Sequence, residues 1–128
     1  MNKKPINRAV VDRAAVTISA RGKVLGRLAT EVATILRGKD SVHFESHLLS
    51  GRPVIVTHAK DVIVTGNKLE DKKYYRHTGY LGNMKTETLS DMMKTKPDEV
   101  IRHAVRGMLP DNRLRQHWLA ALEIREEE

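Results

Sequence analysis

Residues 15–37 read AVTISARGKVLGRLATEVATILR and carry, in this order, the signals of a strand, a turn and a helix. The β-branched start over residues 15–19 predicts a short strand, and the Arg-Gly pair that follows predicts a turn. Apolar residues then recur every three or four positions, which predicts an amphipathic helix over residues 23–37 that ends at Gly38. The stretch therefore predicts the first half of a β-α-β unit.

Two β-branched runs, over residues 53–57 and 61–65, follow this helix. Their nearly continuous apolar character is typical of strands buried on both faces of a sheet. The last third has helical spacing, with Pro97 at a first helical position and Asp111 or Asn112 as the cap of a final helix. Because a strand, a helix and a further buried strand form a parallel crossover unit, we predict an α/β fold whose C-terminal third is helical.

The length of 128 residues predicts one domain with a substantial core. We expect a mobile basic arm over residues 1–13, a single α/β domain over residues 14–125, and an acidic tail over residues 126–128. Lys and Arg number 23 against 16 Asp and Glu, for a formal charge of +7. This surplus favours an anionic partner, and a solvated cationic surface kept for solubility is the plainer alternative.

Two classes of protein are disfavoured by composition. The chain has no cysteine, which excludes disulfides, thiolate zinc sites and cysteine nucleophiles. No apolar run approaches the roughly 20 residues of a membrane-spanning helix, and the N-terminal segment lacks the apolar core of a secretory signal. We therefore expect a cytoplasmic protein with no membrane partner.

All three tyrosines of the chain lie within residues 72–85, among four Lys or Arg side chains, one His and two glycines. Cations reach phosphates, aromatic rings stack on bases, and glycines let the backbone come close, so this composition is typical of a nucleic-acid-binding segment. We expect the segment on the rim of the predicted sheet. Its candidate RNA contacts are Lys72, Lys73, Arg76, His77, Tyr80 and Lys85.

The alternative for this segment is an ordinary hairpin or loop whose tyrosines pack on the core. Adjacent residues of an extended chain point to opposite faces, so one of Tyr74 and Tyr75 is expected to pack and the other to remain free for a partner.

The turn at Gly22 and Lys23 is the candidate site of an enzymatic alternative, because a helix N-terminus binds anions. It matches neither the P-loop pattern nor the dinucleotide fingerprint. A small α/β enzyme with a phosphorylated substrate is therefore the weaker hypothesis. Two other hypotheses remain for this turn. Lys23 and Arg27 hold an RNA phosphate, or they are solvated cations of a plain turn.

His43, Glu45 and His47 share one face if their segment is extended, which is a spacing that metal ligands use. No cysteine supports such a site, and loop histidines are the favoured interpretation. Since no catalytic set of residues emerges, we expect no enzymatic activity, no cofactor, no metal and no small-molecule substrate.

Four segments together resemble the ribosomal protein L13 family of the large ribosomal subunit, in its bacterial type. They are GKVLGRLAT at residues 22–30, VIVTGNK at 62–68, YYRHTGY at 74–80 and AVRGMLPDNRL at 104–114. The four occur in the order of the family and cover most of residues 19–122.

This resemblance implies a three-layer α/β/α domain around a parallel four-stranded sheet. It also implies a structural protein that binds large-subunit ribosomal RNA, contacts neighbouring ribosomal proteins and supports early subunit assembly. An RNA-binding regulator outside the ribosome is the alternative. The matching positions imply RNA contacts for Lys23, Arg27, Lys68, Arg76, His77, Tyr80, Arg106 and Arg113.

The chain departs from the family pattern at several positions. Leu81 and Asn83 replace a proline and a glycine of the family's loop, and Asp111 stands where a lysine is common. Arg115 begins an Arg-Gln pair where Gly-Arg is expected, and the family's tail is replaced by residues 123–128. We assign no RNA contact to this tail.

Overall fold

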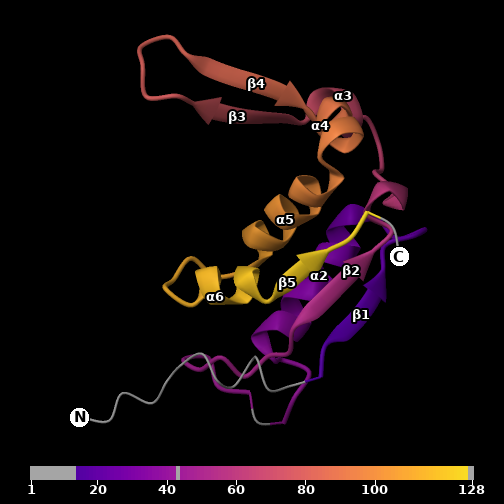
Figure 1. Cartoon of the computed structure of the whole chain (residues 1–128), viewed down its shortest axis with the longest axis vertical. Coiled ribbons are helices and arrows are strands. Elements are labelled where there is room, and N and C mark those ends of the chain that lie inside the picture. The colour runs from indigo at the N-terminus through magenta and orange to yellow at the C-terminus, as the bar shows by residue number, and fades with distance from the viewer. Residues whose placement is uncertain (1–13, 43, 127–128) are drawn as a thin grey trace.

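The computed structural model describes residues 14–42 and 44–126, so the basic arm predicted over residues 1–13 and the last two acidic residues lie outside the described residues. The elements, in chain order, are β1 (Val16–Ser19), α2 (Leu25–Arg37), β2 (Val54–Thr57), the 3-10 turn η1 (Ala59–Asp61), α3 (Lys68–Asp71), β3 (Lys73–His77), β4 (Met84–Thr88), α4 (Leu89–Thr95), α5 (Pro97–Met108), α6 (Arg115–Ala120) and β5 (Leu122–Ile124). A parallel sheet and a separate antiparallel hairpin, β3–β4, make up the strands (Figure 1).

The β-α-β unit predicted from the first 57 residues is confirmed. Strands β1 and β2 pair in parallel, with Val16 opposite Val54, and α2 connects them. Strand β5 pairs in parallel with the other side of β2, with Val54 opposite Leu122. The sequence did not predict β5, because its three residues with a central glutamate are too short to show a period.

Helices cover one face of this sheet. The register aligns Thr17, Ile55 and Glu123 across the strands on one face, and Thr17 and Glu123 are exposed. Alternate residues on the other face, among them Val54 and Val56, join the core that α2 and α5 complete. In Figure 1 the sheet accordingly lies in front of α2.

The predicted three-layer arrangement is therefore wrong for the described residues, which form two layers. In the strand order β1-β2-β5, each later strand is added at the same edge of the sheet. Because parallel strands are joined by right-handed crossovers, both connections place their helices on the same side of such a sheet. A helical layer on the opposite face would need a reversal of the strand order.

The strand predicted over residues 61–65 is reduced to a single parallel bridge between Ile63 and Val24. The N–H of Ile63 donates to Lys23 O at 2.9 Å, and the N–H of Leu25 donates back to Ile63 O at 3.0 Å. The pairing does not extend beyond this bridge, because the partner segment around Val24 is confined between the turn after β1 and the start of α2 at Leu25. The sheet thus has three parallel strands rather than four.

Helix α2 buries the apolar face that its sequence predicts, including Leu28 and Leu36. Each buried leucine contributes about 1.5–3 kcal/mol relative to an exposed one. The helix ends at Gly38, whose φ of 82° suits a glycine. The following loop passes so close that a Cβ on Gly51 would lie 1.8 Å from Leu36 O, so only glycine fits there.

The helical last third is confirmed as α4, α5 and α6, although β5 follows them. Pro97 occupies the first turn of α5, as predicted. The predicted cap of the final helix is wrong: Leu114 is the N-cap of α6, and it makes no side-chain capping hydrogen bond. Asn112 instead accepts a hydrogen bond from the N–H of Leu114 at 3.0 Å, within the loop before the helix. No helix among residues 14–42 and 44–126 is long and apolar enough to span a membrane.

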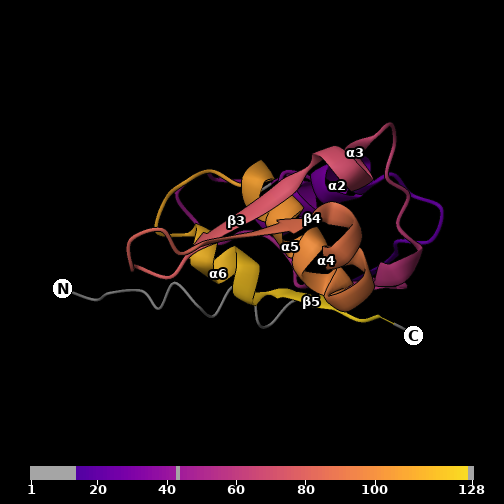
Figure 2. The same ribbon diagram turned by 90° about the horizontal axis from the view of Figure 1, so that it is seen from above.

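The tyrosine-rich segment does not lie on the rim of the parallel sheet. It forms the β3–β4 hairpin, which projects from α3 and α4 at the end of the molecule away from the sheet (Figure 1). Seen from above, the hairpin and the connection between α5 and α6 extend toward the same side (Figure 2). The fold thus presents the predicted binding segment as a separate arm.

Candidate nucleic-acid interface

The hairpin is held by an antiparallel ladder and a glycine-containing turn. Tyr75 pairs with Thr86, and His77 pairs with Met84 at the end of the ladder. Gly79 has a φ of 92°, in the left-handed region that favours glycine. Its N–H donates to Nδ1 of the His77 ring at 2.9 Å. This hydrogen bond ties the His77 side chain to the turn.

The two adjacent tyrosines of β3 have different surroundings, which confirms that one packs and one is free. The ring of Tyr74 lies 5.4 Å from the His103 ring of α5, and the Lys72 ammonium lies 5.7 Å from its centroid. Burial raises the pKa of the Tyr74 phenol above its ordinary value. Tyr75 is 65% exposed, so its ring is available to a partner.

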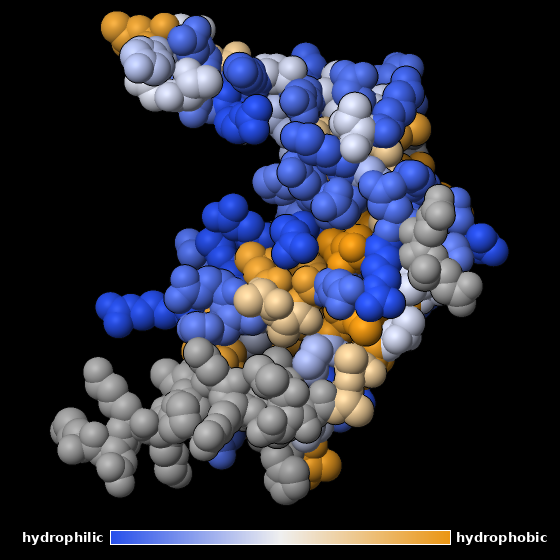
Figure 3. Space-filling view, viewed as in Figure 1, coloured by the Kyte–Doolittle hydropathy of each residue, from blue (hydrophilic) through white to orange (hydrophobic). Residues whose placement is uncertain are grey.

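The far end of the hairpin is apolar and exposed. Tyr80 is 74% exposed, and Leu81 and Met84 are also exposed. Figure 3 shows this apolar tip at the end of an arm that is otherwise hydrophilic. Leu81, a departure from the family pattern, therefore adds apolar surface to the tip rather than to the core.

The cations of α3 and the hairpin have no carboxylate partner within the described residues. All are exposed, and Arg76 and Lys85 face each other across the ladder. Like charges in such a pair repel, so an anion between them stabilises both. The set comprises Lys68, Lys72, Lys73, Arg76 and Lys85.

Cations beside the parallel sheet are paired instead. Arg21 Nε lies 3.2 Å from an oxygen of Asp61, and Lys60 Nζ lies 2.7 Å from Glu126. Arg125 pairs with its neighbour Glu123 across 2.7 Å. These three cations thus differ from those of the hairpin, which have no ion pair within the described residues.

Residues 13–128 match the family model of Ribosomal protein L13. The chain belongs to this family. A large ribosomal subunit protein uL13 of Agathobacter rectalis is 50% identical over 116 residues, which are 91% of this chain and 82% of the relative. The proteins of the same name in Clostridioides difficile and Lawsonia intracellularis are 47% and 48% identical, over 91% and 84% of this chain and 81% and 74% of theirs.

The remaining candidate residues lie on two further surfaces. Arg106 and Arg113 are exposed at the corner between α5 and α6, and neither has an ion pair in the described part of the chain. Arg27 is exposed on α2 and likewise unpaired there, whereas Lys23 Nζ lies 2.7 Å from Glu31. The hairpin and the α5–α6 corner border one hollowed, hydrophilic side of the molecule (Figure 3).

Two departures from the family pattern contact each other. Arg115 donates to Asp111 across 2.8 Å, one helical turn apart. Asp111 therefore neutralises a cation of the α5–α6 corner, which leaves Arg106 and Arg113 as its free positive charges. Of the residues that replace the family tail, Glu123 and Ile124 belong to β5, Arg125 pairs with Glu123, and Glu126 pairs with Lys60.

The turn at Gly22 and Lys23 is poorly equipped as a phosphate cradle. Its N–H groups already donate within the protein: Lys23 to Ala20 O at 3.1 Å, and Gly22 to Asp61 O at 3.4 Å. The N–H of Leu25 is used by the bridge to Ile63. Three backbone donors at this turn are thus occupied, which does not favour the enzymatic alternative.

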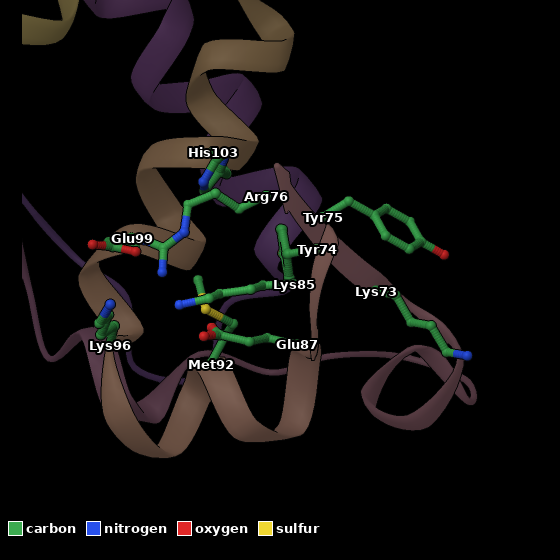
Figure 4. A pocket seen from close by; sticks show the side chains of 10 residues that line it. All are labelled: Lys73, Tyr74, Tyr75, Arg76, Lys85, Glu87, Met92, Lys96, Glu99 and His103. Carbon is green, nitrogen blue, oxygen red and sulfur yellow. The ribbon is translucent and has the colours of Figure 1, made fainter. Parts of the chain in front are cut away.

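A cavity of about 410 Å³ lies between the hairpin and the helices α4 and α5 (Figure 4). Its helical side carries Lys96, Glu99 and His103, which sequence analysis did not select. Glu99 and His103 lie four residues apart on one face of α5, and Lys96 is the N-cap residue of that helix. Sequence alone does not show that these residues face the hairpin, because this depends on how the hairpin packs beside the helices.

The metal hypothesis gains no support from the described residues. His43 lies outside them, and Glu45 and His47 lie 3.4 Å apart on an exposed loop. No group of three His, Asp or Glu side chains among the described residues is arranged to hold a metal ion.

Proposed function

We propose that this protein is a structural constituent of the large ribosomal subunit that binds large-subunit ribosomal RNA and supports early subunit assembly. Its family and the names of its relatives support this role. The observation that carries it is the hairpin, whose cations lack carboxylate partners in the described chain and surround exposed tyrosines. The partners are this RNA and neighbouring ribosomal proteins, on cytoplasmic ribosomes.

The proposed interface has one main surface and two supporting ones. The hairpin supplies stacking and phosphate contacts, and the α5–α6 corner and α2 add phosphate contacts. Regular RNA duplex hides its base edges, so the hairpin is best suited to a single-stranded loop or a distorted helix. The proposed RNA contacts are Lys23, Arg27, Lys68, Lys72, Lys73, Arg76, His77, Tyr80, Lys85, Arg106 and Arg113, all within a single RNA-binding domain over residues 14–125.

Lys23 is the weakest member of this set. Its ammonium is already neutralised in part by Glu31, and an RNA phosphate would have to compete with that carboxylate. The family gives no reason to expect an enzyme, and the occupied N–H groups of the turn agree with a structural role.

Fractionation of source-cell lysates on sucrose gradients tests this function. We expect the protein to sediment with large subunits, and the purified protein to bind large-subunit ribosomal RNA with an affinity that falls steeply with salt. About six phosphate contacts give a slope of log affinity against log salt of roughly −4 to −5. A salt-independent interaction, or sedimentation away from large subunits, would contradict the proposal, and the latter would favour an extra-ribosomal regulator.

A matched pair of variants refines the test. Arg106→Ala removes an exposed cation without an ion pair in the described chain, and it should reduce the salt slope by about 0.7–0.9. Arg21→Ala removes a cation that is paired with Asp61 on the sheet side, and it should leave the slope unchanged. Equal effects of the two would show that binding depends on net charge rather than on this surface.

A further inference from the structure

The cavity between the hairpin and the helices, called here the notch, has the size and the chemistry of a nucleotide site. Its volume of about 410 Å³ lies within the range of small-molecule pockets. The hairpin lines it with Tyr74, Arg76, Lys85 and Glu87, and the helices α4 and α5 line it from the other side.

One wall of the notch is aromatic. The Tyr74 and His103 rings lie 5.4 Å apart and are inclined by 43°. Met92, which is buried, lies beside them. Aromatic rings next to a thioether offer a surface on which a base can stack without regard to its hydrogen-bonding edge.

The rest of the notch carries charges of both signs that are not joined to each other. In Figure 4 the side chains of Arg76, Lys85 and Lys96 converge on the opening together with Glu87 and Glu99, whereas Tyr75 and Lys73 point away. No ion pair joins any two of these five charged groups in the described structure. Both kinds of charge are therefore available to a ligand that bears an anion and hydrogen-bond donors.

We propose that the notch binds one unstacked nucleotide of the RNA, with the phosphate at the three cations and an amino-bearing base edge at Glu87 or Glu99. This inference rests on the proposed function. The base stacks on the wall of Tyr74 and His103, and a carboxylate accepts from its exocyclic amine. Uracil lacks that amine, and its oxygen at position 4 would repel a carboxylate even where its N3–H donates to it, so the notch disfavours uridine.

Mononucleotides of equal size provide the probe. Cytidine and uridine 5′-monophosphates, CMP and UMP, differ at position 4 of the base, which is an amine or an oxygen, and at N3, which carries a proton only in uracil. In NMR titrations of the full chain, CMP should produce saturable shifts in the signals of Tyr74, Lys96 and His103, with a Kd at least three times lower than that of UMP. Glu87→Gln and Glu99→Gln together should remove the preference, and Lys96→Ala should weaken both ligands.

Three results would overturn the inference. They are the absence of saturable shifts with either nucleotide, shifts confined to the outward-facing Tyr75, and a CMP preference that survives both glutamine substitutions. The amide spectrum of each variant reports whether it is folded, and the Lys96→Ala titration does not depend on the glutamate variants.

Binding of ribosomal RNA separates this inference from the function on which it rests. Lys96→Ala should weaken RNA binding several-fold, whereas Lys94→Ala, an exposed cation of α4 outside the notch, should not. If the wild-type protein binds RNA and the two variants behave alike, the notch assignment fails and the ribosomal function stands. If the wild-type protein does not bind the RNA, both fail.

Discussion

The sheet side and the hairpin of this protein use the same residue types for opposite purposes. Beside the sheet, Arg21 is paired with a carboxylate, Trp118 is buried, and Gly51 lies against another segment's backbone. On the hairpin, Arg76 has no carboxylate partner in the described chain, Tyr80 is exposed, and Gly79 has open space around it. These groups therefore stabilise the fold on the sheet side, whereas on the hairpin they remain available to a ligand.

The largest expected effect is on the buried aromatic residue. Trp118→Ala should lower the free energy of unfolding by about 3–5 kcal/mol, because it opens a cavity in the core and removes a ring that lies 5.7 Å from the Arg37 guanidinium. Tyr80→Ala should change the free energy of unfolding by no more than about 0.5 kcal/mol. Urea unfolding of both variants measures the difference.

Trp118→Phe is the matched control for this prediction. The indole Nε1–H is buried and has no acceptor in the described structure, so the phenylalanine loses no hydrogen bond. We expect it to cost clearly less than the alanine. A loss equal to that of Trp118→Ala would contradict this and show that the indole N–H is hydrogen-bonded in the folded protein.

The next largest effects on stability are expected at two glycines. Gly51→Ala places a Cβ 1.8 Å from Leu36 O, so the end of α2 or its loop must move, and we expect a loss of about 2–3 kcal/mol. Gly79→Ala meets nothing within 4 Å, but its φ of 92° strains an alanine, at a cost of about 1–2 kcal/mol confined to the turn. Thermal unfolding ranks the two. The reverse order would mean that the hairpin turn, and not the α2 contact, limits stability.

The smallest effect concerns the partly packed tyrosine. Burial raises the pKa of Tyr74, so above about pH 10 the unfolded chain loses the phenolic proton before the folded protein does. The free energy of unfolding therefore falls as the pH rises through this raised pKa, and this contribution is fully retained at lower pH. Tyr74→Phe should show a shallower fall in urea unfolding between pH 9 and 11. An identical pH profile would place the Tyr74 ring in solvent.

The sequence predicted what depends on local pattern. The helical period of residues 25–37 and the β-branched runs beside it were sufficient for the parallel β1-α2-β2 unit. The alternation of an extended chain was sufficient to predict that only one of Tyr74 and Tyr75 packs. These signals are intrinsic to the segments themselves.

What the sequence could not predict depends on distant partners. The β-branched run over residues 61–65 lacks a long enough neighbour to become a strand, and β5 is too short to show a period. The ion pair of Lys23 spans eight residues, beyond the helical spacing of three or four. The notch exists only because the hairpin docks beside α5, so Glu99 and His103 gave no sign of a site on their own.

The separation of stability from binding is tested most directly by the double variant Arg76→Ala with Tyr80→Ala. We predict that its affinity for large-subunit ribosomal RNA falls by at least tenfold, because it loses a phosphate contact and a stacking ring, while its free energy of unfolding stays within about 0.5 kcal/mol of wild type. An unchanged RNA affinity, or a loss of stability as large as that of Trp118→Ala, would contradict the account and make the hairpin a packing element.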